Sequence, residues 1–409
     1  MVVAGAARAD NTVTIGARAL AAAGVAHADS TVTIGALYPL AQRPDARWAI
    51  ETAVAIVNAP HPGLAGLPLG AGQGLPNLAG AKLSVSLADD LDNPSVAQAQ
   101  ALRFVTHDHV AALIGAGTAA ETLAASAVAA HHATPFLVPD EMAPGIIGRG
   151  DGWVYRTSPL AADIARAYTR FLVQQKSAGG KIDTVAVLAP ASEPGKEFAA
   201  VLCDAAKQAG LACSGIRYPP GANDLSGLVQ DLKAGNPDVV IAHADPAIAR
   251  LLVTTMNTLG YRPPVMIGDD AGFSRPSFIT GAGNLAQGLI GRGVWNPGDP
   301  GTATRLVNDL YKSKSGHDLD DPSAEVMEGV FVLADAIDRA GSTDATAVRD
   351  ALRRADLQPD RLIVGYDGVK FDATGRNTLA ATYLTQLQGK QYVTVWPPER
   401  AAGKLALPF

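Results

Sequence analysis

The feature that most constrains the fold is a regular alternation of short apolar segments with amphipathic helix patterns. The stretch TVTIGALYPL after Asp29 has the composition of a strand, and residues 48–58 carry Ile50, Val54 and Val57 at helical spacing. Strand patterns recur as KLSVSLADD, VAALIG, TPFLVP, DTVAVLAP, LACSGIRYP, PDVVIAHA and PVMIGDD. Buried strands that alternate with helices predict parallel sheets covered by helices on both faces. These units exceed one open sheet of normal width, so the 409 residues predict two α/β lobes.

Helix patterns fill the intervals between these strands. Apolar residues at helical spacing predict helices at 93–105, 119–133, 164–175, 194–209, 248–259, 324–339 and 346–355. Residues 60–79 are rich in Gly, Pro, Leu and Asn, which predicts an irregular surface loop, and residues 381–396 predict a β-rich tail. Ligands bind at the carboxyl ends of strands in such folds, so the loops after the strands form the candidate site.

Composition and motifs exclude several classes of function. The formal net charge is -6 and no Lys/Arg-rich run occurs, which argues against a nucleic-acid partner. No apolar stretch reaches the roughly 18–20 residues of a membrane-spanning helix. The sequence has no G-x-S-x-G elbow and no Walker A motif, and GAGTAAE offers only Gly115 and Gly117 of a dinucleotide fingerprint. His131 and His132 have no metal-ligand spacing, so we expect neither a metal nor a cofactor.

The N-terminus contains the same strand pattern twice. ADNTVTIGA at residues 9–17 and ADSTVTIGA at residues 28–36 match in eight of nine letters. Each follows an Ala-rich run that ends in A-x-A, the pattern a signal peptidase accepts. Only the second copy leads into LYPL and stands one helix before KLSVSLADD. We therefore expect residues 1–28 to be a leader ending near Ala28, and the mature chain to be periplasmic.

The two cysteines, Cys203 and Cys213, fit no metal motif. In an exported chain they could form one disulfide, and otherwise they could be two buried thiols. The sequence leaves both alternatives open.

Several phrases in order carry a resemblance to a known family. These are TIGALYPL, the long segment from LPNLAGAKLSVSLADD to VAALIGAGTAAET, then TPFLVP, WVYRTSP and VKFDATG. Together they resemble the periplasmic solute-binding proteins of ATP-driven importers, specifically the type I leucine/isoleucine/valine-binding group. The resemblance runs from about Asp29 to the end of the chain.

The resemblance implies an α/β fold of two Rossmann-like lobes joined by three crossover strands, which closes around its ligand by a hinge. The crossovers would fall near 155–159, 288–297 and 371–375. Lobe one would then comprise 29–156 with 293–372, and lobe two 157–292 with 373–409.

The resemblance also implies which loops of lobe one contact the ligand. Family members hold a ligand carboxylate with a Ser after the "IG" strand and a Thr in a P-x-x-T-A-P loop. In this sequence the first position is Ala119, beside Thr118, and the second is Met142 in the loop PDEMAP. Both hydroxyls are lost, which weakens the expectation of an amino-acid ligand. Thr118, Ala119, Asp140, Glu141 and Met142 are the candidate contacts of lobe one.

In lobe two the acidic residue that binds a ligand ammonium matches Asp270, and Asp245 takes the place of an expected Tyr. Trp295 could stack on a flat ligand or pack at the hinge. The predicted cleft loops carry many carboxylates, with Arg43 and Arg47 as the only nearby cations; the carboxylates are Glu121, Asp140, Glu141, Asp245, Asp269 and Asp270. We expect Glu121 and Glu141 to face solvent as helix N-terminal charges.

The resulting hypothesis is a non-catalytic, monomeric receptor. It would capture a small polar or amphipathic solute, such as an amino acid-like compound, an amine or a small hydroxylated aromatic compound, and deliver it to the membrane permease of an ABC transporter. A sensor of the same fold that controls a regulator is the first alternative. An enzyme that uses the cleft carboxylates is a weaker one, because no nucleophile or cofactor motif accompanies them.

Overall fold

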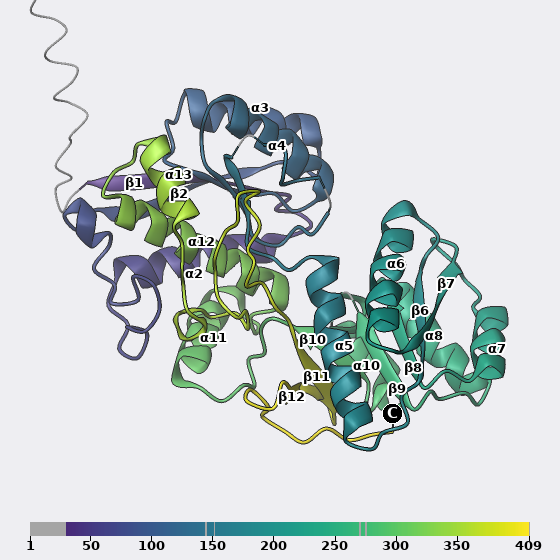
Figure 1. The fold of residues 1–409 in the computed structure, drawn as a ribbon. Helices are drawn as coiled ribbons and strands as arrows, with labels where there is room; N and C mark the ends of the chain where they lie inside the picture. The colour runs from purple at the N-terminus through teal and green to yellow at the C-terminus, as the bar shows by residue number, and fades with distance from the viewer. Residues whose placement is uncertain (1–29, 144, 151, 270, 275, 409) are drawn as a thin grey trace, which may run out of the picture.

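The computed structural model describes residues 30–143, 145–150, 152–269, 271–274 and 276–408. The predicted leader, residues 1–28, and Asp270 lie outside the described residues. Figure 1 shows two α/β bodies placed side by side, each built around its own sheet. We refer to them as lobe one and lobe two.

Lobe one contains a five-stranded sheet in the order β2-β1-β3-β4-β5. All of its strand pairs are parallel, as the alternation of strands and helices predicts. Its strands are β1 (Thr31–Tyr38), β2 (Lys82–Asp89), β3 (Leu113–Gly115), β4 (Phe136–Val138) and β5 (Val154–Arg156). Its first helices are α2 (Pro44–Asn58), α3 (Pro94–Thr106) and α4 (Ala119–His131).

Alternate side chains of β1 enter two different cores, because successive residues of a strand point to opposite faces. Ile34 and Tyr38 pack with α2, while Leu37 packs with α3 and α4 on the other face. Gly35 permits this arrangement: a Cβ at this position would lie 2.6 Å from Leu113 Cδ2. The glycine thus lets β1 lie at the centre of the sheet, where its carboxyl end reaches the site.

Lobe two contains a seven-stranded sheet in the order β12-β11-β10-β9-β8-β6-β7. Its strands are β6 (Thr184–Pro190), β7 (Ala212–Tyr218), β8 (Val239–His243), β9 (Val265–Asp269), β10 (Ile290–Gly293), β11 (Tyr383–Gln388) and β12 (Gln391–Trp396). The strands from β6 to β10 are parallel, whereas β11 and β12 form an antiparallel hairpin at one edge. This hairpin confirms the predicted β-rich tail.

Helices cover both faces of the second sheet. One face packs against α5 (Ala161–Ser177) and α6 (Glu193–Gln208), and the other against α7 (Ser226–Gly235) and α8 (Pro246–Thr258). Short helices α9 (Ala271–Ser274) and α10 (Pro276–Ala282) follow β9.

The chain passes between the lobes three times. It leaves lobe one after β5, and it returns after β10 to form helices that pack with α2; these are α11 (Thr302–Ser315), α12 (Asp321–Ala340) and α13 (Ala345–Arg353). It crosses again between Phe371, in the core of lobe one, and β11. The three predicted crossovers are therefore confirmed, while the exact lobe boundaries stay a prediction.

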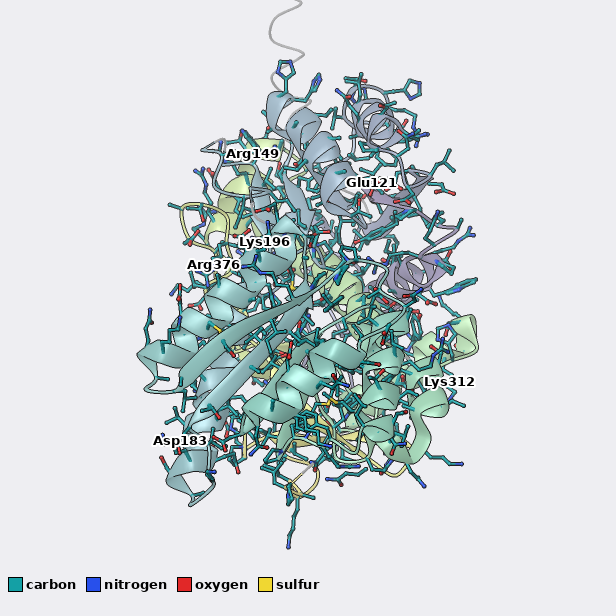
Figure 2. The ribbon with its side chains drawn as sticks, turned by 90° about the vertical axis from the view of Figure 1, so that its right-hand side faces the viewer. Glu121, Arg149, Asp183, Lys196, Lys312 and Arg376 are labelled. Atoms are coloured by element: carbon teal, nitrogen blue, oxygen red, sulfur yellow. A yellow bond between two sulfur atoms is a disulfide. The ribbon has the colours of Figure 1, made fainter. Side chains whose placement is uncertain are left out.

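An ion pair ties the first and third crossovers together. The Arg376 guanidinium lies 2.6 Å from a carboxylate oxygen of Asp163, which is almost fully buried at the start of α5. In Figure 2, Arg376 and Lys196 lie between Glu121, which belongs to lobe one at the top, and Asp183, which belongs to lobe two at the bottom. The connections between the lobes are thus anchored by charge as well as by backbone pairing.

One expectation about the elements is confirmed only in part, and two helices were not predicted. Residues 60–79 form the predicted irregular segment, with only the short 3₁₀ helix η1 (Pro76–Leu78), and many of them are exposed, but the segment does not lie wholly on the surface. Its leucines are buried in the core of lobe one, including Leu64, Leu67 and Leu75. Helices α7 and α11 were not predicted; each buries only two apolar side chains, Val229 and Leu232 in α7 and Val307 and Tyr311 in α11.

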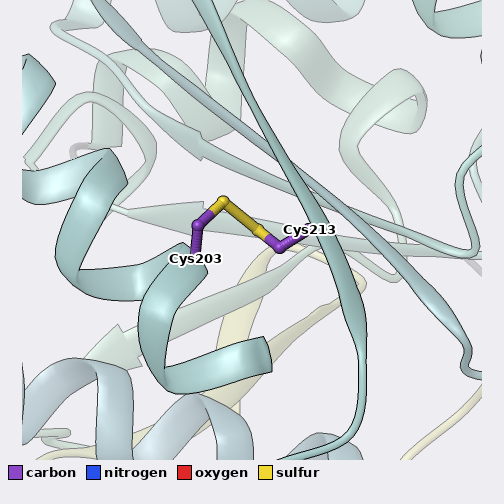
Figure 3. The surroundings of a disulfide bond; sticks show 2 residues. All are labelled: Cys203 and Cys213. Carbon is purple, nitrogen blue, oxygen red and sulfur yellow. A yellow bond between two sulfur atoms is a disulfide. The ribbon is translucent and has the colours of Figure 1, made fainter. Parts of the chain in front are cut away.

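Cys203 and Cys213 form a disulfide (Figure 3). The bond joins α6 to β7, the edge strand of the second sheet, with the two Cα atoms 5.1 Å apart. Of the two alternatives that the sequence left open, the structure therefore supports the disulfide and not the free thiols.

Candidate functional site

The candidate site lies where the carboxyl ends of both parallel sheets meet. The strand order reverses at β1 and β3 in lobe one, and at β6 and β8 in lobe two. Such switch points open a crevice for ligands. The side chains that follow these strands therefore define the site, which we call the cleft.

The lobe-one wall of the cleft contains a buried ion pair. The Arg43 Nη1 atom pairs with Oδ2 of Asp140, and the Tyr38 hydroxyl donates to the other carboxylate oxygen at 3.4 Å. Burial, and then the Asp140 charge, raises the pKa of Tyr38 well above its usual range. Burial alone would lower the pKa of Arg43, yet the Asp140 carboxylate raises it. Tyr38 therefore stays neutral and Arg43 stays charged, so the Arg43 guanidinium supplies the counter-charge beside the buried Asp140 carboxylate.

The Arg43 guanidinium still has hydrogen-bond donors that are available to a ligand. Its side chain is 23% exposed, whereas that of Asp140 is 1% exposed. Its Nε and Nη2 atoms donate no hydrogen bond to any described residue. A guanidinium carries five N–H donors, so the Arg43 side chain can still donate hydrogen bonds to an anionic or carbonyl group of a ligand.

The lobe-two wall is organised around Asp269, which is completely buried at the end of β9. Arg292 Nε lies 2.7 Å from Oδ1, the Tyr168 hydroxyl donates to the same oxygen at 2.5 Å, and His243 Nδ1 lies 2.8 Å from Oδ2. Phe198 stacks on the His243 ring at 4.5 Å. Burial alone would raise the pKa of Asp269, but Arg292 and the hydrogen bonds outweigh it and hold the pKa well below its usual range. Asp269 is thus an ionised centre that orients three side chains.

A row of acidic residues on α12 lies beneath the cleft, spaced i, i+4 and i+7 on one helix face. Asp321 Oδ1 accepts from the backbone N–H groups of Val294 and Trp295 at 2.8 and 2.6 Å. Glu325 Oε1 accepts from the Tyr366 hydroxyl at 2.7 Å. The third member, Glu328, accepts from the Ile363 N–H at 2.8 Å. Burial raises the pKa of Asp321 to about 6, of Glu325 to about 8 and of Glu328 to about 7.

Arg292 links the two walls electrostatically. It pairs with Asp269 of lobe two, and its charge offsets part of the rise in pKa that burial causes at Asp321 and Glu325 on α12. Sequence reasoning missed Arg292 because it lies on a crossover strand, not in a loop after a strand. The α12 row was also missed, although acids at i, i+4 and i+7 within the apolar first half of the helix were a visible signal.

A family model described as "Periplasmic binding protein" matches residues 31–391 of the chain. The chain belongs to the periplasmic binding protein family. It is a solute-binding protein with the type I two-lobed fold.

This periplasmic binding protein is similar to Leu/Ile/Val-binding protein homolog 7 of Brucella suis biovar 1 (strain 1330). The two sequences are 28% identical over 352 residues, which cover 80% of this chain and 84% of the relative.

Solved structures show the same fold. An ABC transporter substrate-binding protein from Desulfitobacterium hafniense, in complex with Leu, superimposes with a TM-score of 0.72 at 20% identity and covers 90% of this chain and 100% of its own. A solute-binding protein of an ABC transporter from Rhodopseudomonas palustris BisB5, in complex with 3,4-dihydroxybenzoic acid, gives a TM-score of 0.66 at 18% identity. It covers 88% of this chain and 95% of its own.

The binding protein places its predicted loop residues unevenly around the cleft. Thr118 precedes α4, and its hydroxyl bonds to Glu121 in the first turn instead of capping the helix. Glu121 (Figure 2) is only 2% exposed, so the expectation that it faces solvent is wrong. The Thr118 hydroxyl and the helix N-terminus compensate its charge. Ala119 is the first residue of α4 and is half-buried.

The loop after β4 contacts the first crossover. Glu141 is half-buried and Oε1 accepts from the Ala143 N–H at 2.7 Å, so it folds back onto its own loop and is not a helix-terminal charge. Burial raises its pKa. The Ser158 hydroxyl donates to the Glu141 carbonyl at 3.1 Å. Met142 packs against the core cluster of lobe two that contains α5, so it lies where the lobes meet.

The remaining predicted residues lie farther apart. Asp245 is exposed and caps α8, because its Oδ1 accepts from the N–H groups of Ala247 and Ile248 at 2.8 and 3.1 Å. Trp295 is 6% exposed and packs into the core of lobe one. Asp270 lies outside the described residues. Ligand contacts by these residues stay predictions.

Among the described residues, no group of three or more His, Cys, Asp or Glu side chains is placed to hold a metal ion. A separate search of the same residues finds no helix with the length and apolar character needed to cross a membrane.

Proposed function

We propose that this chain is an extracytoplasmic receptor that captures a small solute in the cleft by hinge closure and delivers it to the permease of an ABC transporter. The carrying observation is the convergence of charged side chains from both lobes, joined by Arg292 on a crossover. A polar, partly enclosed site at a hinge suits reversible capture of a small molecule. We further propose that the mature receptor is monomeric, works in the periplasm and catalyses no reaction.

The ligand that fits the cleft best carries both an anionic or carbonyl group and a donor group. Arg43 supplies unused donors on the lobe-one wall, where Ala119 and Met142 lack the expected hydroxyls. Asp140 and Asp269 are each compensated by an arginine, which leaves the second carboxylate oxygen of Asp321 on α12 as an acceptor. The neighbouring Glu325, whose pKa burial raises to about 8, is mainly protonated at neutral pH. Amino acid-like compounds and small hydroxylated aromatic acids meet both demands. The names of the relatives above, which mention Leu, Ile, Val and dihydroxybenzoic acid, are consistent with this class.

Isothermal titration calorimetry tests this proposal. The protein is first unfolded to remove any bound ligand and is then refolded before the titration. The panel holds L-amino acids, their decarboxylated amines, their deaminated acids, hydroxybenzoates and polyols. We expect saturable heat with at least one carboxylate-bearing member, and mass spectrometry should recover that compound unchanged. Absence of heat and of thermal stabilisation across the whole panel would contradict the proposal.

Delivery to a permease needs a second measurement. In proteoliposomes that contain the host's cognate importer, the loaded receptor should stimulate ATP hydrolysis more than the ligand-free receptor. A response of a transcriptional or signalling regulator without any transport would instead favour the sensor.

A further inference from the structure

Glu325 is an acid of the cleft that pairs with no cation among the described residues. It lies on α12, and its side chain is half-buried. Its Oε1 atom accepts from the Tyr366 hydroxyl at 2.7 Å, whereas Oε2 accepts no hydrogen bond from any described residue. Oε2 is not sealed from solvent either, so a ligand in the cleft can reach it. One oxygen of this carboxyl group is therefore held in place, and the other is available for recognition.

Charged and titratable groups from several elements act on Glu325. They are Asp321 of the same helix, Asp140 after β4, Arg292 of β10, Tyr38 at the end of β1, and Tyr366. The neighbouring arginines already have partners, because Arg43 pairs with Asp140 and Arg292 pairs with Asp269. The surroundings of Glu325 are therefore acidic, and a ligand would have to supply the positive charge that it lacks.

Helices α2 and α13 pack against α12 but direct their charged side chains to other partners. The pairs are Arg47 with Glu51 and Asp45 with His317 at α2, and Arg349 with Asp350 within α13, where Arg353 acts on Tyr155. The groups around the cleft, and not these helices, therefore set the charge of Glu325.

An uncompensated carboxylate at this position is costly. Burial raises the pKa of Glu325 to about 8, and the carboxylates of Asp140 and Asp321 add to this effect. The Tyr366 hydroxyl and Arg292 act in the opposite direction but do not outweigh it. Since Oε1 accepts from Tyr366, the proton of the neutral acid lies on Oε2. A positive charge placed against Oε2 would reverse the balance and favour the carboxylate.

The ligand group that fits these surroundings is an ammonium. Asp321 lies one turn before Glu325 on the same helix face, and one of its oxygens is already used by the backbone N–H groups of Val294 and Trp295. An ammonium carries three N–H donors, enough for Oε2 of Glu325 and the second oxygen of Asp321. A ligand carboxylate would instead meet two acids here, whereas Arg43 offers it donors on the lobe-one wall.

We propose that Glu325 selects ligands that carry an ammonium group, and that it releases its proton to solvent when such a ligand binds. This inference rests on the proposed function, because it concerns the solute captured in the cleft. The ammonium keeps its own charge, pairs with Oε2 and with the second Asp321 oxygen, and forms no covalent bond. Affinity for an ammonium ligand should then rise with pH, by up to about tenfold per pH unit, as long as the free receptor still carries the proton.

Isothermal titration calorimetry of the full chain, prepared as above, tests the proposal with a matched pair of probes. L-leucine is the ligand of the Desulfitobacterium hafniense protein compared above, and 4-methylpentanoate is the same molecule without its ammonium. At about pH 8 we expect L-leucine to bind at least about ten times more tightly than 4-methylpentanoate. Between about pH 6 and pH 7.5 the affinity for L-leucine should rise by about five- to tenfold per pH unit, while that for 4-methylpentanoate should not rise.

Proton release is measured by repeating the L-leucine titration at neutral pH in phosphate and in Tris, whose heats of ionisation differ. We expect about one proton released per ligand bound by the wild-type chain, and close to none for Glu325→Gln. Glu325→Gln should also weaken L-leucine binding at about pH 8 by at least about tenfold and leave 4-methylpentanoate binding no weaker. Glu325→Asp keeps an acid at this position, so it should release a proton again and bind L-leucine more tightly than Glu325→Gln.

Asp338→Asn is the matched control. Asp338 is a buried acid near the other end of α12, burial raises its pKa, and its carboxylate accepts from the Asn77 N–H at 2.8 Å. Its replacement should leave both proton release and affinity unchanged. His243 on the lobe-two wall can also titrate in this pH range. The comparison with Glu325→Gln, and not the pH slope alone, therefore assigns the proton.

Three outcomes overturn the proposal: L-leucine gives no heat at about pH 8, it binds without releasing a proton, or Glu325→Gln releases as many protons as the wild type. If L-leucine fails but a compound without an ammonium binds, such as a hydroxybenzoate, this inference is wrong and the proposed function stands. If no compound of the whole panel binds, both are wrong.

Discussion

Arg292 Nε lies 2.7 Å from Oδ1 of Asp269, and this contact joins the crossover strand β10 to the carboxyl end of β9. The same arginine acts electrostatically on Asp321 and Glu325 of α12. A single guanidinium therefore bears on the geometry of both walls of the cleft. The consequences for stability and for ligand binding can be separated by mutation.

Arg292→Gln should lower the free energy of unfolding by about 3–5 kcal/mol, because it leaves the buried Asp269 carboxylate without its cation. Urea unfolding at neutral pH measures this change. The double variant Asp269→Asn/Arg292→Gln should lose less than the sum of the two single changes, since it removes both charges. Arg305→Gln, on the exposed face of α11, is the control. A loss for Arg292→Gln no larger than that of this control would contradict the buried-pair interpretation.

Low pH should weaken the ion pair between Asp269 and Arg292. The pKa of Asp269 in the folded protein is held below its value in the unfolded chain. Its contribution is therefore complete above the unfolded pKa, which is about 4, and is lost as the pH falls toward the folded pKa. Unfolding followed between about pH 5 and pH 3 should show a slope that is smaller in Asp269→Asn. An identical slope in both proteins would count against this assignment.

For the acidic residues of α12, the free energy of unfolding should depend on pH in the opposite direction. Burial raises the pKa of Glu328 to about 7, above that of the unfolded chain. Stability is then greatest below the unfolded pKa of about 4.3 and falls as the pH rises toward 7, by up to roughly 1.4 kcal/mol per pH unit for one group. Glu328→Gln keeps an oxygen for the Ile363 N–H and should flatten this slope in unfolding measurements. Glu51→Gln, at an exposed site on α2, should leave the slope unchanged.

The disulfide should stabilise lobe two without affecting the cleft. Cys203 and Cys213 are ten positions apart and tie the edge strand β7 to α6. Removing a bond that closes a loop of this length costs about 2–3 kcal/mol in the chain-entropy description. Cys203→Ala/Cys213→Ala should therefore unfold at lower temperature in calorimetry and match the reduced wild type. If the affinity for a cleft ligand fell as much as the stability, a purely structural role would be wrong.

The sequence predicts the fold better than the site. Strand composition and helical periodicity anticipate both sheets, because a buried parallel strand such as β8 is recognisable from a few consecutive residues. The site depends on partners far apart in the chain: Arg43 and Asp140 are separated by 97 positions, and Arg292 and Asp269 by 23. No local pattern reveals that these carboxylates are compensated.

The burial of Glu121 has the same origin. Its position in the first turn of α4 is visible in the sequence and correctly suggests a helix-terminal charge. Whether such a side chain points to water depends on the packing around α4, which no local pattern encodes. The buried leucines of residues 60–79 have a related explanation, because an irregular backbone can still place apolar side chains in a core.

The final prediction concerns ligand recognition by Arg43. For a cleft ligand found in the calorimetric panel, Arg43→Gln should weaken binding at least about tenfold through loss of a charge-assisted contact. Arg47→Gln is a matched control, because Arg47 is exposed and pairs with Glu51 only four residues away.

Arg43→Gln also uncovers the buried Asp140 charge, so the double variant Asp140→Asn/Arg43→Gln is needed. If Arg43 contacts the ligand, the double variant regains stability but not affinity. If Arg43 only neutralises Asp140, both recover together, and its proposed role in binding is wrong.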